Sequence, residues 1–246
     1  MIYFIITLKS KQISNDFAFV SNCVTKLIAH LLSNSNDQCK VILTRHELPF
    51  GFKTHERLID LDCSNLPVPF DKQEMMVDKV SKLERAYEFV KKNGYGVTMQ
   101  IDYDDSISLN LLQFLFTLKI SLAEAYYLQR GYVYPEGSAW VYVDDNIYRR
   151  CGSTWIVHWR AEDFEPDSNG VKNVLKWGHH DLFDNLPKVG FTVRGYYSLS
   201  CLYRTDNGEN HSDIRWKGWH GKKRFVRDLL SIRFFSKAKR NEFGVC

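Results

Sequence analysis

Along the first hundred residues, short apolar runs alternate with segments whose apolar residues have helical spacing. This pattern predicts strands that alternate with helices. Residues 1–8 form an apolar run typical of a buried strand. Residues 17–33 place apolar side chains at helical spacing, after a group of capping residues at 14–16. Further elements are predicted as strands at 41–43, 57–63 and 96–102 and as a periodic helix at 74–93. Strands joined by helical crossovers predict an α/β fold with a mainly parallel sheet.

The second half of the chain has a different pattern. Residues 109–130 contain the longest apolar segment, which predicts a core helix because polar residues interrupt it too often for a membrane span. Residues 131–145 predict a hairpin that turns at Pro135-Glu136-Gly137, and residues 151–159 predict another strand. From 160 to 221 we expect mostly loops.

These patterns divide the chain into three parts. Residues 1–221 are expected to form one domain, with a regular half at 1–105 and a loop-rich half at 106–221. Residues 222–246 form a basic tail, in which residues 222–240 alone carry a net charge of +7. Because the whole chain carries +4, the remainder is net acidic at −3. The tail alternates basic and apolar residues, so it predicts a helix that either lies on an anionic membrane or packs on the body.

Composition narrows the class of protein. The six cysteines are scattered without close pairs, which indicates neither a zinc framework nor a disulfide scaffold and favours a reducing cytoplasm. The amino terminus has lysines after its apolar run, the reverse order from a signal peptide. No nucleic-acid motif accompanies the acidic body, so we expect no nucleic-acid partner. We expect a cytoplasmic protein, with the inner face of the membrane as an alternative location.

The strand at 96–102 ends in a cluster of acids, Asp102, Asp104 and Asp105. In parallel α/β sheets, ligands bind outside the carboxyl ends of the strands, where this cluster falls. Carboxylate oxygens at this spacing suit Mn²⁺ or Mg²⁺, which also take phosphate oxygens as ligands. The sequence therefore predicts a cation site on the edge of the sheet, although a solvated turn would place acids in the same way.

The chain resembles the GT-A glycosyltransferases, and within them the small bacterial enzymes that build surface polysaccharides. The resemblance covers about the first 160 residues and is carried by MIYFIITLKSKQIS, KVILTRHELP, DKVSKLERAYEFVKKNG, MQIDYDD and GYVYPEGSAWVYVDDNIYRRCGSTWIVH. It implies a Rossmann-like GT-A fold with a loop-rich acceptor half and a basic C-terminal helix. Asp102-Tyr103-Asp104 corresponds to the family's Asp-x-Asp motif.

The resemblance also implies roles for individual residues in the first half. Asp104 binds the metal directly, Asp102 contacts the donor ribose or the metal's water shell, and Asp105 supports them. Asp78 and Lys79 approach the nucleotide, unless they only open a solvated helix. Donor contacts are also expected from the segment after the first strand, at Thr7 and Lys9.

Residues in the second half are predicted to complete the site. The segment GHHDLFDNLP offers Asp181 as the base that deprotonates the acceptor, or as a helix cap, with Asp184 as the alternative base. His180 stands where the family usually has Glu and is expected to support the site. His211, in a polar loop, is expected to be a further metal ligand or simply solvated.

Together these features predict a metal-dependent glycosyltransferase, inverting by default. Its partners are a UDP-, GDP- or dTDP-sugar donor and a saccharide or lipid-linked acceptor. The first alternative is a protein that binds nucleotides or carbohydrates without catalysis. The second is a phosphohydrolase of the haloacid dehalogenase type, in which Asp102 would be the nucleophile. That family places its motif on the first strand, whereas about a hundred residues precede Asp102 here.

Overall fold

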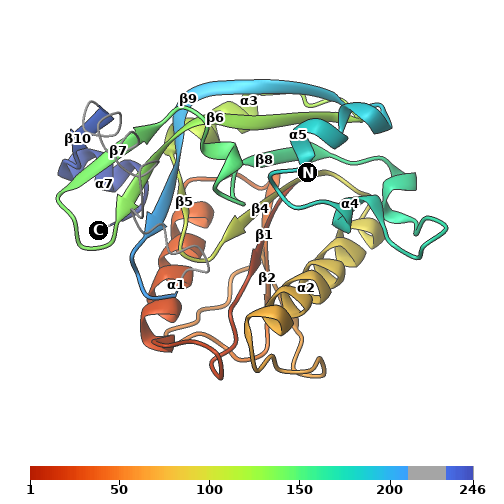
Figure 1. Ribbon diagram of the computed structural model, residues 1–246, viewed down its shortest axis with the longest axis horizontal. Coiled ribbons are helices and arrows are strands. Elements are labelled where there is room, and N and C mark those ends of the chain that lie inside the picture. Colours follow the sequence, from red (N-terminus) through yellow and green to blue (C-terminus); the bar gives the residue numbers. More distant parts are fainter. Residues whose placement is uncertain (210–230, 246) are drawn as a thin grey trace, which may run out of the picture.

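The computed structural model describes residues 1–209 and 231–245. Its first half is the α/β unit that the sequence predicts (Figure 1). The elements are β1 (Ile2–Thr7), α1 (Phe17–Ser33), β2 (Cys39–Arg45), β3 (Leu58–Asp62), α2 (Lys72–Lys92) and β4 (Val97–Asp102). The four strands are parallel and lie in the order β4-β1-β2-β3. The predicted fold class is thereby confirmed for the half that holds the acid cluster.

Strand β1 is buried on both faces because its alternate side chains pack against different helices. Phe4 and Ile6 belong to the core cluster under α1, whereas Tyr3 and Ile5 belong to the cluster under α2. In Figure 1 the two helices accordingly lie on either side of β1 and β2. Asp16 caps α1 by accepting a hydrogen bond from the Phe19 amide, as the sequence predicts for the group at 14–16.

The second half continues the same sheet beyond β4, now mainly with antiparallel strands. Strand β8 pairs antiparallel with both β4 and β6, and β6 pairs antiparallel with β7. The described elements are β5 (Ser106–Ile107), α3 (Leu109–Thr117), β6 (Glu124–Pro135), β7 (Trp140–Asp144), β8 (Trp155–His158), α4 (Asn173–Lys176), α5 (Leu182–Asn185), β9 (Thr192–Thr205), β10 (Ile232–Phe234) and α7 (Lys237–Glu242). Short 3-10 turns lie at Ile147–Arg149, Ala161–Phe164 and Pro187–Val189. The predicted hairpin at 131–145 is confirmed as β6 and β7.

The predicted helix at 109–130 is wrong over most of its length. Helix α3 ends at Thr117, and the chain turns through Ala123, whose φ of 59° lies in the left-handed region. Residues 124–135 then form β6, which lies between β8 and β9. The aromatic residues Tyr126 and Tyr127 favour a strand, and pairing on both edges of β6 outweighs the helical spacing of the sequence.

Two further segments differ from the sequence-based expectation. Residues 192–205, expected to be loop, form the long strand β9, which runs parallel to β6. In the described part of the tail, residues 232–234 form the edge strand β10 on β7, and residues 237–242 form helix α7. The rest of the predicted tail helix, at 222–230, lies outside the described residues. Phe235 and Phe243 flank α7 and are buried in a third core cluster with Tyr132 and Tyr134. Packing on the body therefore fixes this end of the tail.

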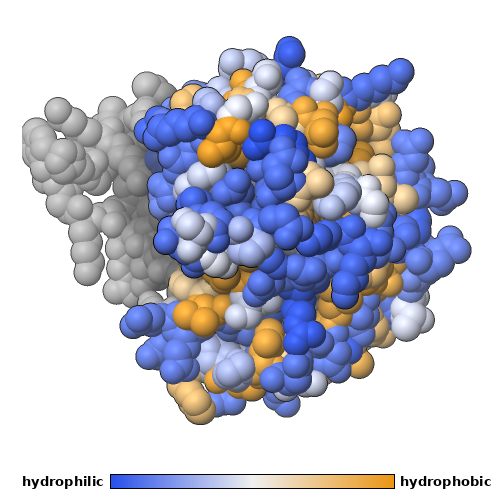
Figure 2. All heavy atoms as spheres, turned by 90° about the vertical axis from the view of Figure 1, so that its right-hand side faces the viewer, coloured by the Kyte–Doolittle hydropathy of each residue, from blue (hydrophilic) through white to orange (hydrophobic). Residues whose placement is uncertain are grey.

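No helix among the described residues is long and apolar enough to cross a lipid bilayer. Figure 2 shows the side of the molecule on which α2 and α4 lie in Figure 1. That face is predominantly hydrophilic, and its hydrophobic side chains form small separate areas. This face therefore presents no continuous apolar surface of the kind that marks a large permanent interface.

Candidate active site

The carboxyl ends of β1 and β4 lie side by side, and a cavity opens beyond them. Thr7, the last residue of β1, is in register with Asp102, the last residue of β4. The cavity has a volume of about 290 Å³. Its lining includes the predicted donor and metal residues Thr7, Lys9, Asp78, Lys79, Asp102 and Asp104. The structure thus brings together side chains from three separate segments of the first half.

A larger hollow of about 510 Å³ lies elsewhere, between α1 and residues 51–55. Its lining contains Lys26, Lys53 and His55 but no carboxylate. It therefore lacks the hard oxygen ligands that a divalent cation prefers. The smaller cavity at β1 and β4 is the better candidate for chemistry, because it holds the acids and the lysines together.

The three acids of the cluster have different surroundings. The side chain of Asp102 is about one-third exposed, and its Oδ1 lies 2.6 Å from the Lys79 Nζ. Asp104 is 5% exposed and accepts a hydrogen bond of 2.8 Å from the Asn207 amide. Burial, followed by the charge of Asp102, raises the pKa of Asp104 to about 6. Asp102 and Asp104 therefore repel each other, and a cation near them would relieve that repulsion.

Asp105 is placed as a structural acid behind the cavity. Its carboxylate accepts hydrogen bonds from the Ser153 hydroxyl at 2.6 Å and the Cys151 thiol at 3.0 Å. The same Ser153 oxygen accepts a hydrogen bond from the backbone amide of Asp102. Burial, together with the charges of Asp104 and Asp102, raises the pKa of Asp105 well above its ordinary value. Asp105 thus ties the acid cluster to the loop before β8, and its role in a site stays a prediction.

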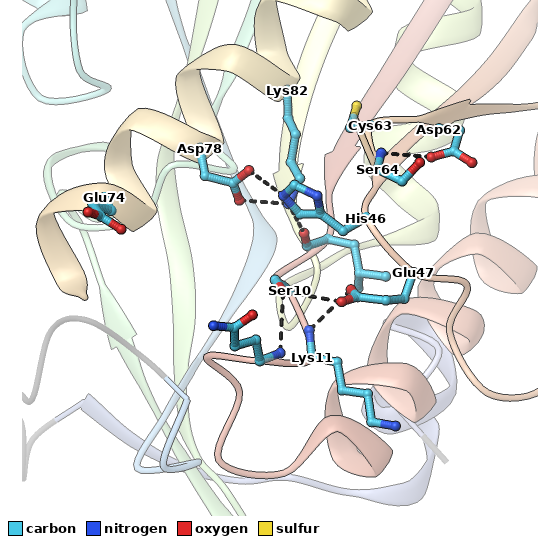
Figure 3. A network of polar contacts seen from close by, with 12 residues as sticks. Ser10, Lys11, His46, Glu47, Asp62, Cys63, Ser64, Glu74, Asp78 and Lys82 are labelled. Carbon is cyan, nitrogen blue, oxygen red and sulfur yellow. Dashed lines mark hydrogen bonds and ion pairs between the residues drawn. The ribbon is translucent and has the colours of Figure 1, made fainter. Parts of the chain in front are cut away.

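Helix α2 contributes a buried polar network beside the cavity, drawn in Figure 3. Asp78 accepts from Lys82 at 2.7 Å and lies 2.7 Å from the His46 Nε2. Lys82 also donates to the Leu8 carbonyl at 2.8 Å. Burial lowers the pKa of Lys82, an effect that Asp78 opposes. This network fixes the chain just beyond β1, so Asp78 shapes the cavity even without touching a ligand.

Lys9, the other predicted donor contact, is held by an acid from the second half. Its Nζ lies 2.5 Å from the Glu209 carboxylate, whose side chain is fully buried. Glu209 also accepts from the Asp16 amide at 2.6 Å and the Ser14 hydroxyl at 3.1 Å. Glu209 therefore fixes the segment between β1 and α1 on one side of the cavity.

Five cavity-lining residues of the second half have no role in the sequence-based prediction: Arg150, Gly152, His179, Tyr203 and Glu209. The Arg150 Nε lies 2.9 Å from Asp144, while its Nη1 is buried and has no hydrogen-bond acceptor among the described residues. Burial lowers the pKa of His179, which keeps the imidazole neutral at neutral pH. A signal was available in the sequence, because Arg150 and Gly152 flank the first residue of the strand predicted at 151–159, and part of that segment forms β8 next to β4.

Gly152 leaves little space beside the acid cluster. A Cβ atom at this position would lie 3.1 Å from the Asp102 Oδ2 and 3.8 Å from the His179 Nδ1. The backbone of the loop before β8 therefore lies so close to Asp102 that a side chain at position 152 would crowd its carboxylate. This approach places the imidazole of His179 and the carboxylate of Asp102 around the same backbone position.

The remaining predicted residues lie away from this cavity or outside the described part of the chain. Asp181 stands at the start of α5, half exposed, with its Oδ2 3.5 Å from the His180 Nε2. It makes no capping hydrogen bond through its side chain, and neither residue lines the cavity. His211 lies outside the described residues. The roles of Asp181, His180 and His211 stay predictions.

The acids that face the cavity fit a divalent cation only in combination with a ligand. Among residues 1–209 and 231–245, no group of three or more His, Cys, Asp or Glu side chains is arranged to hold a metal. Asp102 and Asp104 do offer two hard carboxylates at one cavity. Mg²⁺ is commonly held by one or two carboxylates together with substrate phosphates and water. The donor set is therefore of the kind that completes its coordination with a phosphate-bearing ligand.

No family model matches the chain, and no curated protein matches it. Among solved structures, residues 1–349 of TarS from S. aureus are similar, with 10% identity and a TM-score of 0.45. The match covers 82% of this chain but only 60% of that one. A glucose-1-phosphate thymidylyltransferase from Bacillus anthracis, in complex with sucrose, matches with 13% identity and a TM-score of 0.46, covering 90% and 99% of the two chains.

A third similar structure is a glycosyltransferase involved in glycosylation of the major capsid of PBCV-1. It has 7% identity and a TM-score of 0.44, and the match covers 93% of this chain and 98% of that one. All three TM-scores lie below 0.5, and none of these similarities establishes a shared activity.

Proposed function

We propose that the chain is a metal-dependent glycosyltransferase that uses a nucleotide-sugar donor. The observation that carries this proposal is the single cavity at the carboxyl ends of β1 and β4, where Asp102 and Asp104 meet Thr7 and Lys79. Ligands of parallel α/β sheets bind at this position. Two carboxylates for a cation, and lysines for phosphates, match the chemistry of a nucleoside diphosphate. The GT-A resemblance of the sequence favours the same ligand.

The residues of the cavity divide the work of binding. Asp104 and Asp102 would hold Mn²⁺ or Mg²⁺, which supplies neutralisation of the charge that develops on the diphosphate leaving group. Lys79 and Arg150 line the cavity and would donate to phosphate oxygens. Thr7 and the Lys9–Glu209 pair shape the wall next to β1. His179 is held neutral in the same cavity and offers a lone pair there.

In the proposed reaction, a base removes the proton from an acceptor hydroxyl that attacks the anomeric carbon, with inversion. Asp181 is proposed as this base, supported by His180, on the strength of the sequence segment 178–187. Its position outside the cavity does not exclude it, because catalytic hydrogen bonds in empty enzymes are often long and shorten when the substrate binds. His179 lies two residues earlier and lines the cavity, so it is the competing base.

The acceptor is proposed to be a saccharide or a lipid-linked saccharide in surface polysaccharide synthesis. The aromatic residues Trp140 and Phe234 are more than half exposed and pack against each other at the edge of the sheet. Arg233 and Lys237 lie next to them in the basic tail. Exposed aromatic residues beside basic residues are typical of proteins that rest on an anionic membrane. We therefore propose a peripheral contact with the inner face of the membrane.

The proposal is tested by measuring nucleotide release from UDP-, GDP- and dTDP-sugars with Mn²⁺, with and without EDTA. We expect one nucleotide class to be released in a metal-dependent reaction that Asp104→Asn slows by on the order of a thousandfold. Asp145→Asn is the matched control, because Asp145 is exposed and pairs with Arg130 away from the cavity. Undiminished turnover in Asp104→Asn would reject the mechanism, and nucleotide binding without turnover would point to a non-catalytic binding protein.

A further inference from the structure

Lys79 forms an ion pair with Asp102, one of the two carboxylates that would bind a cation in the proposed site. Its Nζ lies 2.6 Å from the Asp102 Oδ1, and both side chains line the cavity. Of the three clustered acids, Asp102 pairs with a lysine, while Asp104 accepts from an amide and Asp105 from a hydroxyl and a thiol. The positive charge nearest the Asp-x-Asp segment is therefore a side chain of the protein itself.

The ion pair of Lys79 differs from that of its neighbour Lys82, one turn along α2. Lys82 is 1% exposed and donates to two acceptors, the Asp78 carboxylate and the Leu8 carbonyl, so it is fixed in place. The Lys79 side chain is about one-third exposed, as is that of Asp102. Partly exposed ion pairs contribute little to stability, so this pair can be broken at little cost in free energy.

Lys79 also stays charged. A lysine is ordinarily protonated at neutral pH, and the Lys79 Nζ lies 2.6 Å from the Asp102 carboxylate, which favours its charged form. A charged ammonium and a divalent cation repel each other strongly at contact distances inside a protein cavity. They cannot both stay next to the same carboxylate oxygen.

We infer that Lys79 is a displaceable counter-ion of Asp102, which neutralises this acid in the empty protein and moves to the phosphates of the donor when a cation binds. The inference rests on the proposed function, since it takes the ligand to be a nucleoside diphosphate with a divalent cation. It has a thermodynamic consequence. In the wild type, nucleotide and metal favour each other's binding, because the phosphates accept the ammonium that the metal displaces.

The test measures Mn²⁺ binding directly, by the electron paramagnetic resonance signal of free Mn²⁺, in the absence of nucleotide. Lys79→Met removes the competing charge, so we expect it to bind Mn²⁺ on the order of tenfold more tightly than the wild type. The same variant should bind nucleotide more weakly. With saturating Mn²⁺, calorimetry should show that Lys79→Met binds UDP, GDP or dTDP, whichever the wild type binds, with about fivefold lower affinity than the wild type. Lys91→Met is the matched control, because Lys91 lies on the same helix and pairs with Glu165 at 2.6 Å, away from the cavity.

The outcomes separate this inference from the proposed function. If the wild type binds nucleotide in a Mn²⁺-dependent way but Lys79→Met binds Mn²⁺ no more tightly, the counter-ion role is overturned and the proposed function stands. If neither protein binds Mn²⁺ with or without any of the three nucleotides, both are overturned. Should Lys79→Met fail to fold by circular dichroism, Lys79→Gln removes the charge while keeping a polar side chain, and the same criteria apply.

Discussion

The two halves of the molecule contribute to the cavity in different ways. The first half is a regular parallel unit whose strand ends place Thr7 and Asp102 side by side. The second half supplies residues that hold the first half's groups in position, such as Ser153 under Asp105 and Glu209 on Lys9. Under the proposed function, the α/β unit supplies the metal-binding acids, whereas the antiparallel part mainly sets their geometry. Variants on the two sides should therefore fail in different ways.

The largest effect is expected from Asp104→Asn in the first half. The loss of a metal-binding carboxylate should lower turnover by on the order of a thousandfold. The free energy of unfolding of the variant, in contrast, should rise. Because the folded-state pKa of Asp104 is about 6, above the ordinary value of 3.8, the folded state binds more protons than the unfolded state between these values, and stability is lost as the pH rises through this window.

Asp104→Asn removes that buried charge. At pH 7 the variant should therefore be more stable than the wild type, by at most about 3 kcal/mol, and near pH 4 the difference should vanish. Thermal melts at the two pH values check this expectation. A variant that melts lower than the wild type at pH 7 would contradict the placement of Asp104 as a buried, repelled acid.

The second-largest effect is expected in the second half of the chain. It tests whether that half supplies the catalytic base. If Asp181 is the base, Asp181→Asn should lower turnover by about a hundredfold, while His179→Gln, which changes a cavity wall, should lower it by about tenfold. Rates at several pH values with the same donor measure both variants. The reverse order of effects would transfer the role of base to His179.

Gly152→Ala is expected to give an intermediate effect through geometry alone. The added methyl would lie 3.1 Å from the Asp102 Oδ2, so the carboxylate must shift by a few tenths of an ångström. A shift of this size at a reacting centre should lower turnover by roughly tenfold. The melting temperature should stay within a few degrees of the wild type. Unchanged kinetics would show that the loop before β8 does not position Asp102.

Glu209→Gln should affect stability more than chemistry. The substitution leaves the largely buried ammonium of Lys9 without its carboxylate, which should cost about 1–3 kcal/mol of unfolding free energy. Urea unfolding of the variant beside Glu162→Gln, at an exposed acid, provides the comparison. Equal urea midpoints for the two variants would mean that the Lys9–Glu209 ion pair between the two halves does not stabilise the fold.

The smallest effect is expected at the edge that is proposed to contact the membrane. Trp140→Ser removes an exposed aromatic ring that contacts Phe234, and it should lower binding to anionic lipid vesicles about twofold to threefold. Sedimentation with vesicles of mixed phosphatidylglycerol and phosphatidylcholine measures the bound fraction. No binding by the wild type itself would remove the proposed membrane contact and leave the transferase proposal intact.

The sequence predicts the first half well because its signals are local. The apolar run at 2–7, the cap at Asp16 and the helical spacing of α1 each arise from residues close together in the chain. The acid cluster is equally local, since strand β4 delivers Asp102 directly. In the second half the signals are not local. Residues 124–135 become a strand because β8 and β9 pair with its two edges, and no short window of sequence contains that information.

The same distinction applies to the candidate site. Thr7, Lys9, Asp78 and Lys79 are predicted from the resemblance to the GT-A family, and all four line the cavity. By contrast, Asn207 reaches Asp104 across more than a hundred positions of the chain, and Glu209 reaches Lys9 across two hundred. Contacts over such separations depend on the register of β9 against β6, which the loop-like composition of that segment conceals. The residues that position the site were therefore harder to predict than those proposed to bind the donor.

The most direct test of the central claim is calorimetric titration of the wild-type protein with UDP, GDP and dTDP, each with and without Mn²⁺. One nucleotide is expected to bind in the micromolar range only when Mn²⁺ is present, and the binding should be lost in Asp102→Asn/Asp104→Asn. Nucleotide binding that is equally tight without the metal and in the double variant would contradict the claim, as would the absence of binding by any of the three nucleotides.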